Sequence, residues 1–155
     1  MRVSFKSEVN AQLKGENPEY LAFKTHTEGT GITLGVEGSG KHATLYALEK
    51  AWGIYEENGP EFYEALLKLI AHTWNGASWS LQGSILGGVA TFMKKYPYYS
   101  EKRFIKNLSS VDQLVIKREA SSINRTNDIA YAVAIARLYN VGNGRGRVNT
   151  ELLIV

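Results

Sequence analysis

Two segments in the middle of the chain carry apolar residues at helical spacing. In residues 43–55 and again in residues 61–75, apolar side chains recur at steps of three or four, which is typical of amphipathic helices. The positions that form these two stripes are Leu45, Leu48, Trp52, Tyr55, Phe62, Leu66, Leu69 and Ile70. The sequence therefore predicts two consecutive helices, each with one face directed toward a core.

The connection between these segments predicts that the two helices lie antiparallel. Asn58-Gly59 is a typical helix end, and Pro60 suits the first position of the following helix. Because the connection is short, the two apolar faces are expected to pack together as a hairpin. Trp52 and Trp74 add large apolar side chains, so we expect this hairpin to form the centre of the core.

Capping residues delimit further helices along the chain. Ser100, Ser109 and Asn127 are the expected N-caps of the last three helices, because their side chains can accept hydrogen bonds from backbone N–H groups. Residues 32–36 have weak strand character, and we expect them either to pair with another short segment, such as residues 152–155, or to remain extended. The helices expected outside the hairpin are residues 3–14, 18–28, 80–96, 101–108, 111–120 and 128–139.

These elements predict an all-α, or mainly α, fold. Residues 1–141 are expected to form one domain, a bundle of roughly seven to eight helices around the central hairpin, with a minor two-stranded element as an addition. Residues 142–155 form a Gly/Arg-rich segment followed by an apolar tail. The chain has 155 residues and 44% hydrophobic residues, which suits one globular domain with a sizeable core.

Composition narrows the class of protein. The chain contains no cysteine, which excludes disulfides and thiolate metal sites and is typical of a cytoplasmic protein. No apolar run is long enough to span a bilayer, and residues 1–6 lack the apolar stretch of a signal peptide. We therefore expect a cytoplasmic protein without a membrane partner.

The charged residues are distributed unevenly. Residues 1–93 contain seven Lys/Arg and ten Asp/Glu, whereas residues 94–147 contain eleven Lys/Arg and four Asp/Glu. These counts give net charges of −3 and +7, and Glu151 brings the total to +3. An acidic first part and a basic second part favour one face that attracts an anionic partner.

The basic part combines cations with tyrosines, which suits nucleic acid. Lysine and arginine attract phosphates, and tyrosine rings stack on bases. In the alternative interpretation, the tyrosines pack against the core and the cations only solvate helix surfaces. The candidate nucleic-acid-binding residues are Lys94, Lys95, Tyr98, Tyr99, Lys102, Arg103, Lys106, Arg145 and Arg147.

A second candidate site lies in the glycine-rich stretch 35–42. Its spacing resembles a phosphate-binding loop, with Gly38, Gly40 and Lys41 as candidate anion-binding residues. His42 occupies the position where such loops carry Ser or Thr, and imidazole is a poor magnesium ligand. The stretch therefore favours a plain anion site at a helix start, or a surface loop, over nucleotide hydrolysis.

Neither the histidines nor the paired glutamates indicate a metal or catalytic site. The three histidines, His26, His42 and His72, lie on different expected elements and match no metal-binding spacing. Glu61 and Glu64 lie near the start of a helix, where their charge stabilises the helix dipole. We expect no metal, no cofactor and no catalysis.

The order of features along the chain resembles a known family. It is similar to the helical region that follows the ParB/sulfiredoxin-like domain in phage and mobile-element ParB-like nuclease-domain proteins. The resemblance implies either a fragment of such a protein or a stand-alone relative without the nuclease-like part. The family's Gly-rich His-Arg signature belongs to the preceding domain and has no match here, so no catalytic residue carries over. The resembling positions are residues 3–8, Asn17-Pro18-Glu19-Tyr20, Gly31, Leu48, Trp52, Leu69, Trp74, Gly87-Gly88-Val89, Phe92, Leu108, Ala120, Ala130, Ala136 and Tyr139-Asn140.

The sequence supports three functional hypotheses. The first is an accessory nucleic-acid-binding helical domain of phage or prophage origin without catalysis of its own, with DNA favoured over RNA as its partner. The second is a phage-encoded protein-interaction module that inhibits or redirects a host protein. The third is a nucleotide or anion binder that uses residues 35–44. A homodimer is compatible with each hypothesis.

Overall fold

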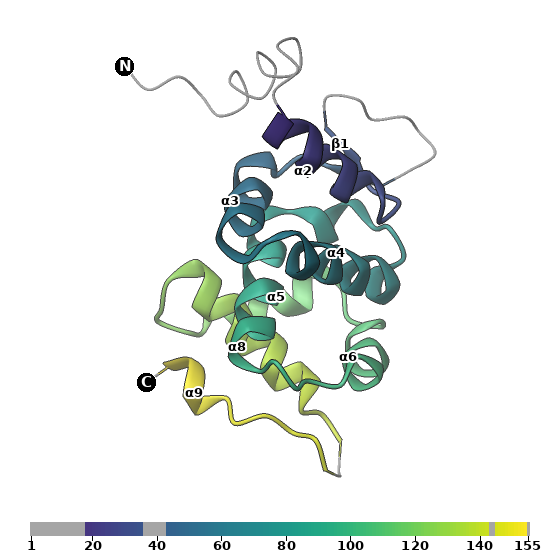
Figure 1. Ribbon diagram of the computed structural model, residues 1–155. Helices are drawn as coiled ribbons and strands as arrows, with labels where there is room; N and C mark the ends of the chain where they lie inside the picture. The colour runs from purple at the N-terminus through teal and green to yellow at the C-terminus, as the bar shows by residue number, and fades with distance from the viewer. Residues whose placement is uncertain (1–17, 36–42, 143–144, 155) are drawn as a thin grey trace.

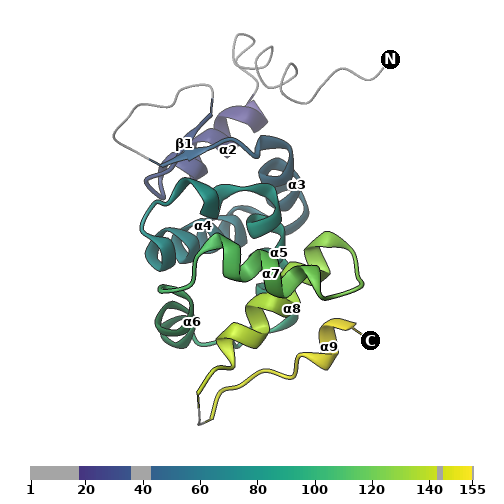
Figure 2. The same cartoon turned by 180° about the vertical axis from the view of Figure 1, so that it is seen from behind.

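The computed structural model describes residues 18–35, 43–142 and 145–154, and it is mainly helical (Figures 1 and 2). The expected first helix, residues 3–14, lies outside the described residues. The mainly α fold predicted from the sequence is confirmed. The described elements are α2 (Pro18–Glu28), β1 (Thr33–Leu34), β2 (Thr44–Leu45), α3 (Leu48–Asn58), α4 (Pro60–Trp74), the 3-10 helix η1 (Ser78–Leu81), α5 (Gly83–Lys95), α6 (Glu101–Leu108), α7 (Gln113–Ser121), α8 (Asn127–Tyr139) and α9 (Glu151–Ile154).

The elements lie in layers along the molecule. In Figure 1, α2 and β1 lie at the top, α3 and α4 lie below them, and α5 and α8 cross beneath that layer. Helix α6 lies against α4 and α8 at the lower right, and α9 contacts α8. Over the described ranges, no helix combines the length and the apolar character that crossing a bilayer requires.

The two strands form a short parallel pair, which corrects one of the expected pairings. Thr33 is opposite Thr44 and Leu34 is opposite Leu45, and both leucines are fully buried. The C-terminal stretch that was the alternative strand partner is helical in α9 and buries Leu153. The tail therefore folds back onto the bundle.

The predicted helical hairpin is present in α3 and α4, but α3 begins later than expected. Pro60 is the first residue of α4, and Gly59 before it has a φ of +86°, which favours glycine because it lacks a Cβ. Tyr55 and Tyr63 meet across the hairpin at 5.5 Å between ring centroids. Burial raises the pKa of Tyr63, whose hydroxyl lies 2.7 Å from the Thr27 hydroxyl.

The two tryptophans do not pack between α3 and α4, where the sequence predicts them. Trp74 is buried at the end of α4, and its indole N–H donates to the carbonyl oxygens of Leu108 and Val111 at 3.0 and 3.1 Å. Trp52 is half-buried and packs on Phe23 of α2, with 5.1 Å between ring centroids. Each tryptophan therefore joins the hairpin to a neighbouring segment.

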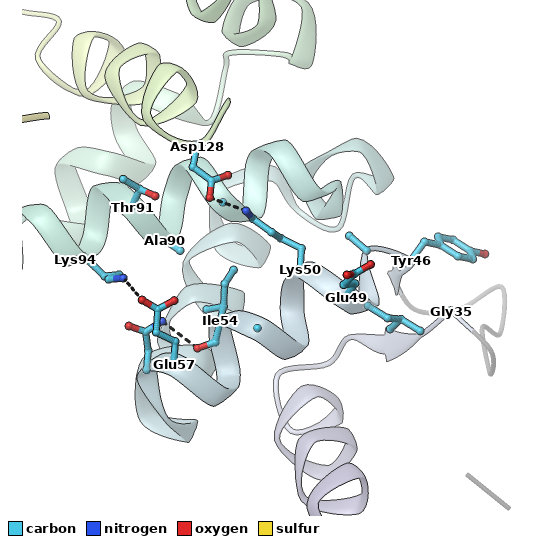
Figure 3. Close-up of a pocket in the computed structure, with 15 residues that line it drawn as sticks. Gly35, Tyr46, Glu49, Lys50, Ile54, Glu57, Ala90, Thr91, Lys94 and Asp128 are labelled. Carbon is cyan, nitrogen blue, oxygen red and sulfur yellow. Dashed lines mark hydrogen bonds and ion pairs between the residues drawn. The ribbon is translucent and has the colours of Figure 1, made fainter. Parts of the chain in front are cut away.

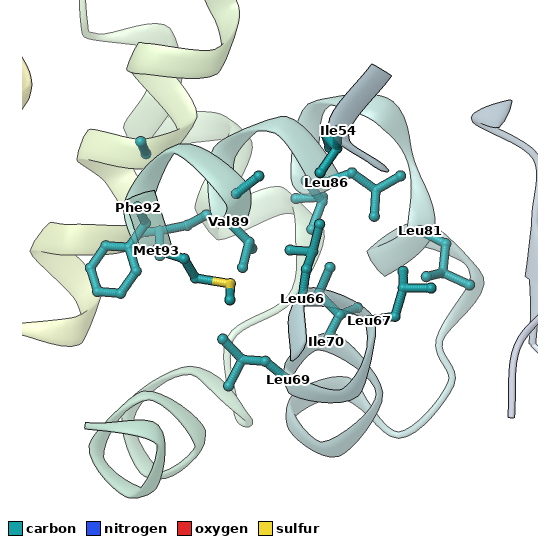
Figure 4. Close-up of a cluster of buried hydrophobic side chains, with 14 of the residues drawn as sticks. Ile54, Leu66, Leu67, Leu69, Ile70, Leu81, Leu86, Val89, Phe92 and Met93 are labelled. Atoms are coloured by element: carbon teal, nitrogen blue, oxygen red, sulfur yellow. The ribbon is translucent and has the colours of Figure 1, made fainter. Parts of the chain in front are cut away.

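The most extensive helix contact is between α5 and α8. The expected helix 80–96 is divided in the structure, because Gln82 is extended between η1 and α5. On α5, Gly88 allows close approach: a Cβ there would lie 2.6 Å from Cβ of Tyr131 and 3.2 Å from its carbonyl carbon. The other wall of the core is α4, whose leucines pack toward Leu86 and Val89 of α5 (Figure 4).

The observed caps agree in part with the prediction. Ser100 caps α6 by accepting a hydrogen bond from the backbone N–H of Arg103 at 3.1 Å, as predicted. Asp112, not Ser109, caps α7, accepting from the N–H of Val115 at 3.1 Å. At α8 the N-cap is Thr126, and Asn127 is the first helical residue.

Candidate functional site

Three segments of the basic part of the chain meet at one end of the molecule. The Tyr96 hydroxyl, at the end of α5, donates to the carbonyl oxygen of Asn149 at 2.7 Å. On α6, Arg103 donates to the carbonyl oxygen of Arg145 at 3.2 Å. The end of α5, helix α6 and the segment after α8 are therefore adjacent, and we call the exposed residues Lys95, Tyr98, Lys102, Lys106 and Arg145 on these segments the basic end.

The side chains of the basic end are available to a partner. Tyr98 is 98% exposed, and Lys95, Lys102, Lys106 and Arg145 are also exposed. Among the residues that the structure describes, no ion pair holds these four cations. Lys102 and Lys106 are one helical turn apart on α6, so they lie on the same side of that helix.

Arg103, predicted to contact phosphate, has a structural role in this fold. Its Nε donates to the carbonyl oxygen of Tyr139 at 2.8 Å, and one terminal nitrogen donates to that of Val141 at 3.4 Å. Its guanidinium also lies over the Tyr139 ring, 5.4 Å from the centroid. Carbonyls at the C-terminal end of α8 lack helical partners, and Arg103 satisfies them together with Asn107.

Three further predicted residues are also engaged within the fold. Lys94 Nζ lies 2.9 Å from a carboxylate oxygen of Glu57. Arg147 Nε donates to the carbonyl oxygen of Gly142 at 3.1 Å. Tyr99 packs on Phe92, and burial, followed by the nearby Glu101, raises its pKa.

Replacing Arg103 tests whether its contacts stabilise the fold. We expect Arg103→Ala to lower the free energy of unfolding by about 2 kcal/mol, because carbonyl oxygens at the end of α8 lose a charged donor. Lys102→Ala, the neighbouring exposed cation, is the matched control and should change it by less than about 0.5 kcal/mol. Urea denaturation of both variants measures the difference, and equal stabilities would show that the Arg103 contacts contribute nothing.

A cleft of about 840 Å³ lies between α3 and α5, on a different part of the surface (Figure 3). Ile54 of α3 and Ala90 of α5 give it apolar walls, and Gly53 adds no side chain. Tyr46, which follows β2, lies at one side of it and is 72% exposed. The cleft thus combines apolar residues with five charged ones, which are Glu49, Lys50, Glu57, Lys94 and Asp128.

An ion pair crosses the cleft from α3 to the start of α8. Lys50 Nζ lies 2.6 Å from Oδ2 of Asp128, and these side chains are 36% and 38% exposed. Gly87 of α5 leaves room for the pair in this arrangement, because a Cβ there would collide with Oδ1 of Asp128 and lie 2.7 Å from Cε of Lys50. Sequence patterns did not predict this pair, since its members are 78 positions apart. Gly87, which lies inside the expected helix 80–96, was the only local indication that another segment approaches closely here.

The candidate anion site is not covered by the structure, and the described histidines form no metal site. Gly38, Gly40 and Lys41 lie outside the described residues. Among the residues that are described, no three His, Cys, Asp or Glu side chains come together as a metal site. His26 Nδ1 lies 2.5 Å from Glu64, and this hydrogen bond lowers the pKa of the Glu64 carboxyl.

Comparison with known proteins gives one result. No curated protein and no solved structure matches the chain. The resemblance to ParB-like nuclease-domain proteins stays a prediction. A family of unknown function, DUF6551, matches residues 4–153, and the chain therefore belongs to this family.

Proposed function

We propose that this protein is an accessory domain that binds nucleic acid, with DNA as the preferred partner, through the basic end. The observation that supports this most directly is the nearly complete exposure of Tyr98 between cations that no carboxylate neutralises in the described part of the chain. A phenol ring in water loses the free energy that burial provides. A ring placed among cations is suited to stacking on a base while the cations contact phosphates.

The geometry limits which residues contribute. Lys95, Lys102, Lys106 and Arg145 can reach phosphates, whereas Arg103 contacts the end of α8. Glu101 lies at the start of α6, and its carboxylate is 3.7 Å from His72. The basic end therefore offers four cations and one aromatic ring, which suits a modest, salt-dependent affinity.

The salt dependence of DNA binding tests this proposal. We expect log K to fall linearly with log salt concentration, at about 0.9 units per phosphate contact for duplex DNA. The double variant Lys102→Gln/Lys106→Gln should reduce that slope by about 1.8 units, because two contacts are removed. Fluorescence anisotropy with a labelled duplex, repeated at several salt concentrations, measures both slopes.

The matched control removes two lysines from other parts of the surface. Lys24→Gln/Lys117→Gln changes the net charge equally but alters α2 and α7. This variant should retain the parental slope. Equal slopes for both double variants would mean that binding depends only on net charge, and no binding at low salt would eliminate the proposal.

A further inference from the structure

The cleft between α3 and α5 has the size and composition of a small-molecule site. Its volume of about 840 Å³ lies within the range of ligand pockets, about 300–1,000 Å³. Apolar walls with a few placed polar groups are typical of such pockets. The cleft and the basic end adjoin at Lys94 and Lys95 but share no residue, and the inference drawn for the cleft does not rest on the proposed function.

The two ion pairs mark the length of the cleft. Lys50 and Glu57 are seven positions apart on α3, and seven residues of α-helix rise about 10.5 Å. Lys50 pairs with Asp128, and Glu57 pairs with Lys94 of α5. Ile54 and Ala90 lie on the stretch between these pairs, as Figure 3 shows. An apolar body of a few rings or a short alkyl chain would fit this stretch.

The charges around the cleft decide which ligands it favours. Among the residues that the structure describes, three carboxylates and two ammonium groups line it, and their formal charges sum to −1. Both ammonium groups already donate to a carboxylate, at 2.6 and 2.9 Å. An anionic ligand would have to break one of these pairs, whereas a cation meets an excess of negative charge.

Asp128 is the best-placed acceptor for a ligand cation. A carboxylate has about four lone-pair positions, and Lys50 uses one of them. Asp128 is also less exposed than Glu57, at 38% against 67%, so water screens its charge less. We propose that the cleft binds a small organic cation, whose apolar body lies on Ile54 and Ala90 and whose ammonium or guanidinium group donates to Asp128.

Three probes with the same body test the charge preference. We would titrate the full chain with 2-phenylethylamine, 3-phenylpropionate and 2-phenylethanol, following backbone amide shifts by NMR. The amine should shift the amides of Gly53, Ile54 and Ala90 in a saturable manner, and it should bind about tenfold more tightly than either analogue. Equal binding of the three probes, or no saturable binding of the amine, would overturn the proposal.

Two substitutions test the location of the site. Gly53→Phe should abolish amine binding, because the space beside Gly53 is open and the new ring would fill that part of the cleft. Ala65→Phe adds the same ring at an exposed position of α4 that does not line the cleft, and it should bind the amine within about twofold of the parent. Undiminished binding by Gly53→Phe would place the ligand elsewhere.

The role of Asp128 needs its own variant and control. Asp128→Asn keeps the side-chain shape but removes the charge, and it should weaken amine binding about tenfold or more. Glu56→Gln removes an exposed carboxylate of α3 that does not line the cleft, and it should leave affinity unchanged. An equal loss in both variants would mean that the amine responds only to overall charge.

Discussion

Gly88→Ala is expected to lower the free energy of unfolding by about 1–3 kcal/mol, the usual cost of overpacking a core. A methyl group at this position would lie 2.6 Å from Cβ of Tyr131 and 3.2 Å from its carbonyl carbon. Neither atom can move unless the backbone of α8 moves with it, so α5 and α8 would have to separate. Thermal and urea denaturation of the variant measure this loss.

Gly53→Ala is the matched control for this effect. It makes the same chemical change in the interior of a helix, but apart from the adjacent residues and the backbone of its own helix no atom lies within 4 Å of the new methyl group. We expect this variant to be more stable than the parent by about 0.5–1 kcal/mol, because alanine has the higher helix propensity. If both variants changed stability in the same direction, close contact between α5 and α8 would not be the cause.

Phe92→Ala should produce the largest loss of stability, about 3–5 kcal/mol. Phe92 is fully buried, and its ring contacts Tyr96, Tyr99 and Phe104 with centroid distances of 5.2, 5.7 and 5.6 Å. Tyr139 of α8 completes the cluster at 5.2 Å. Removing the ring leaves a cavity where three helices meet, and urea denaturation measures the cost.

Tyr98→Ala provides the comparison, since it removes an aromatic ring that is 98% exposed. This variant should unfold within about 0.5 kcal/mol of the parent. It should also weaken DNA binding, because a stacking ring is worth about 1–3 kcal/mol. A large loss of stability in Tyr98→Ala, or none in Phe92→Ala, would contradict the arrangement described for this end of the molecule.

Local patterns in the sequence were sufficient to predict the helices, but not all the contacts between them. Periodicity together with Pro60 predicted the hairpin, and the Ser100 cap predicted the start of α6. Trp74 continues the apolar stripe of α4, which predicts a place in the hairpin seam. Its position at the end of that helix instead brings the indole N–H to the carbonyl oxygens of Leu108 and Val111.

The candidate sites illustrate the same limit. The exposure of Lys102 and Lys106 could be predicted because helical spacing places them opposite the apolar Phe104 and Leu108. Arg103 has the same local surroundings, yet its guanidinium contacts the end of a helix 36 positions away. Lys50 and Asp128 meet only because α3, α5 and α8 cross at Gly87. Pairings over such distances are determined by tertiary packing, which local periodicity does not describe.

Asn140 joins the two ends of the segment after α8, within which Arg147 also donates to the carbonyl oxygen of Gly142. Asn140 donates from its amide nitrogen to the carbonyl oxygen of Val148 and accepts from the backbone N–H of Val148, both at 2.8 Å. The two ends of this segment are thus clamped, and the clamp holds the start of α9 together with the Tyr96–Asn149 hydrogen bond and the buried Leu153. A peptide tag inserted between Asn140 and Val148 should therefore leave the bundle intact.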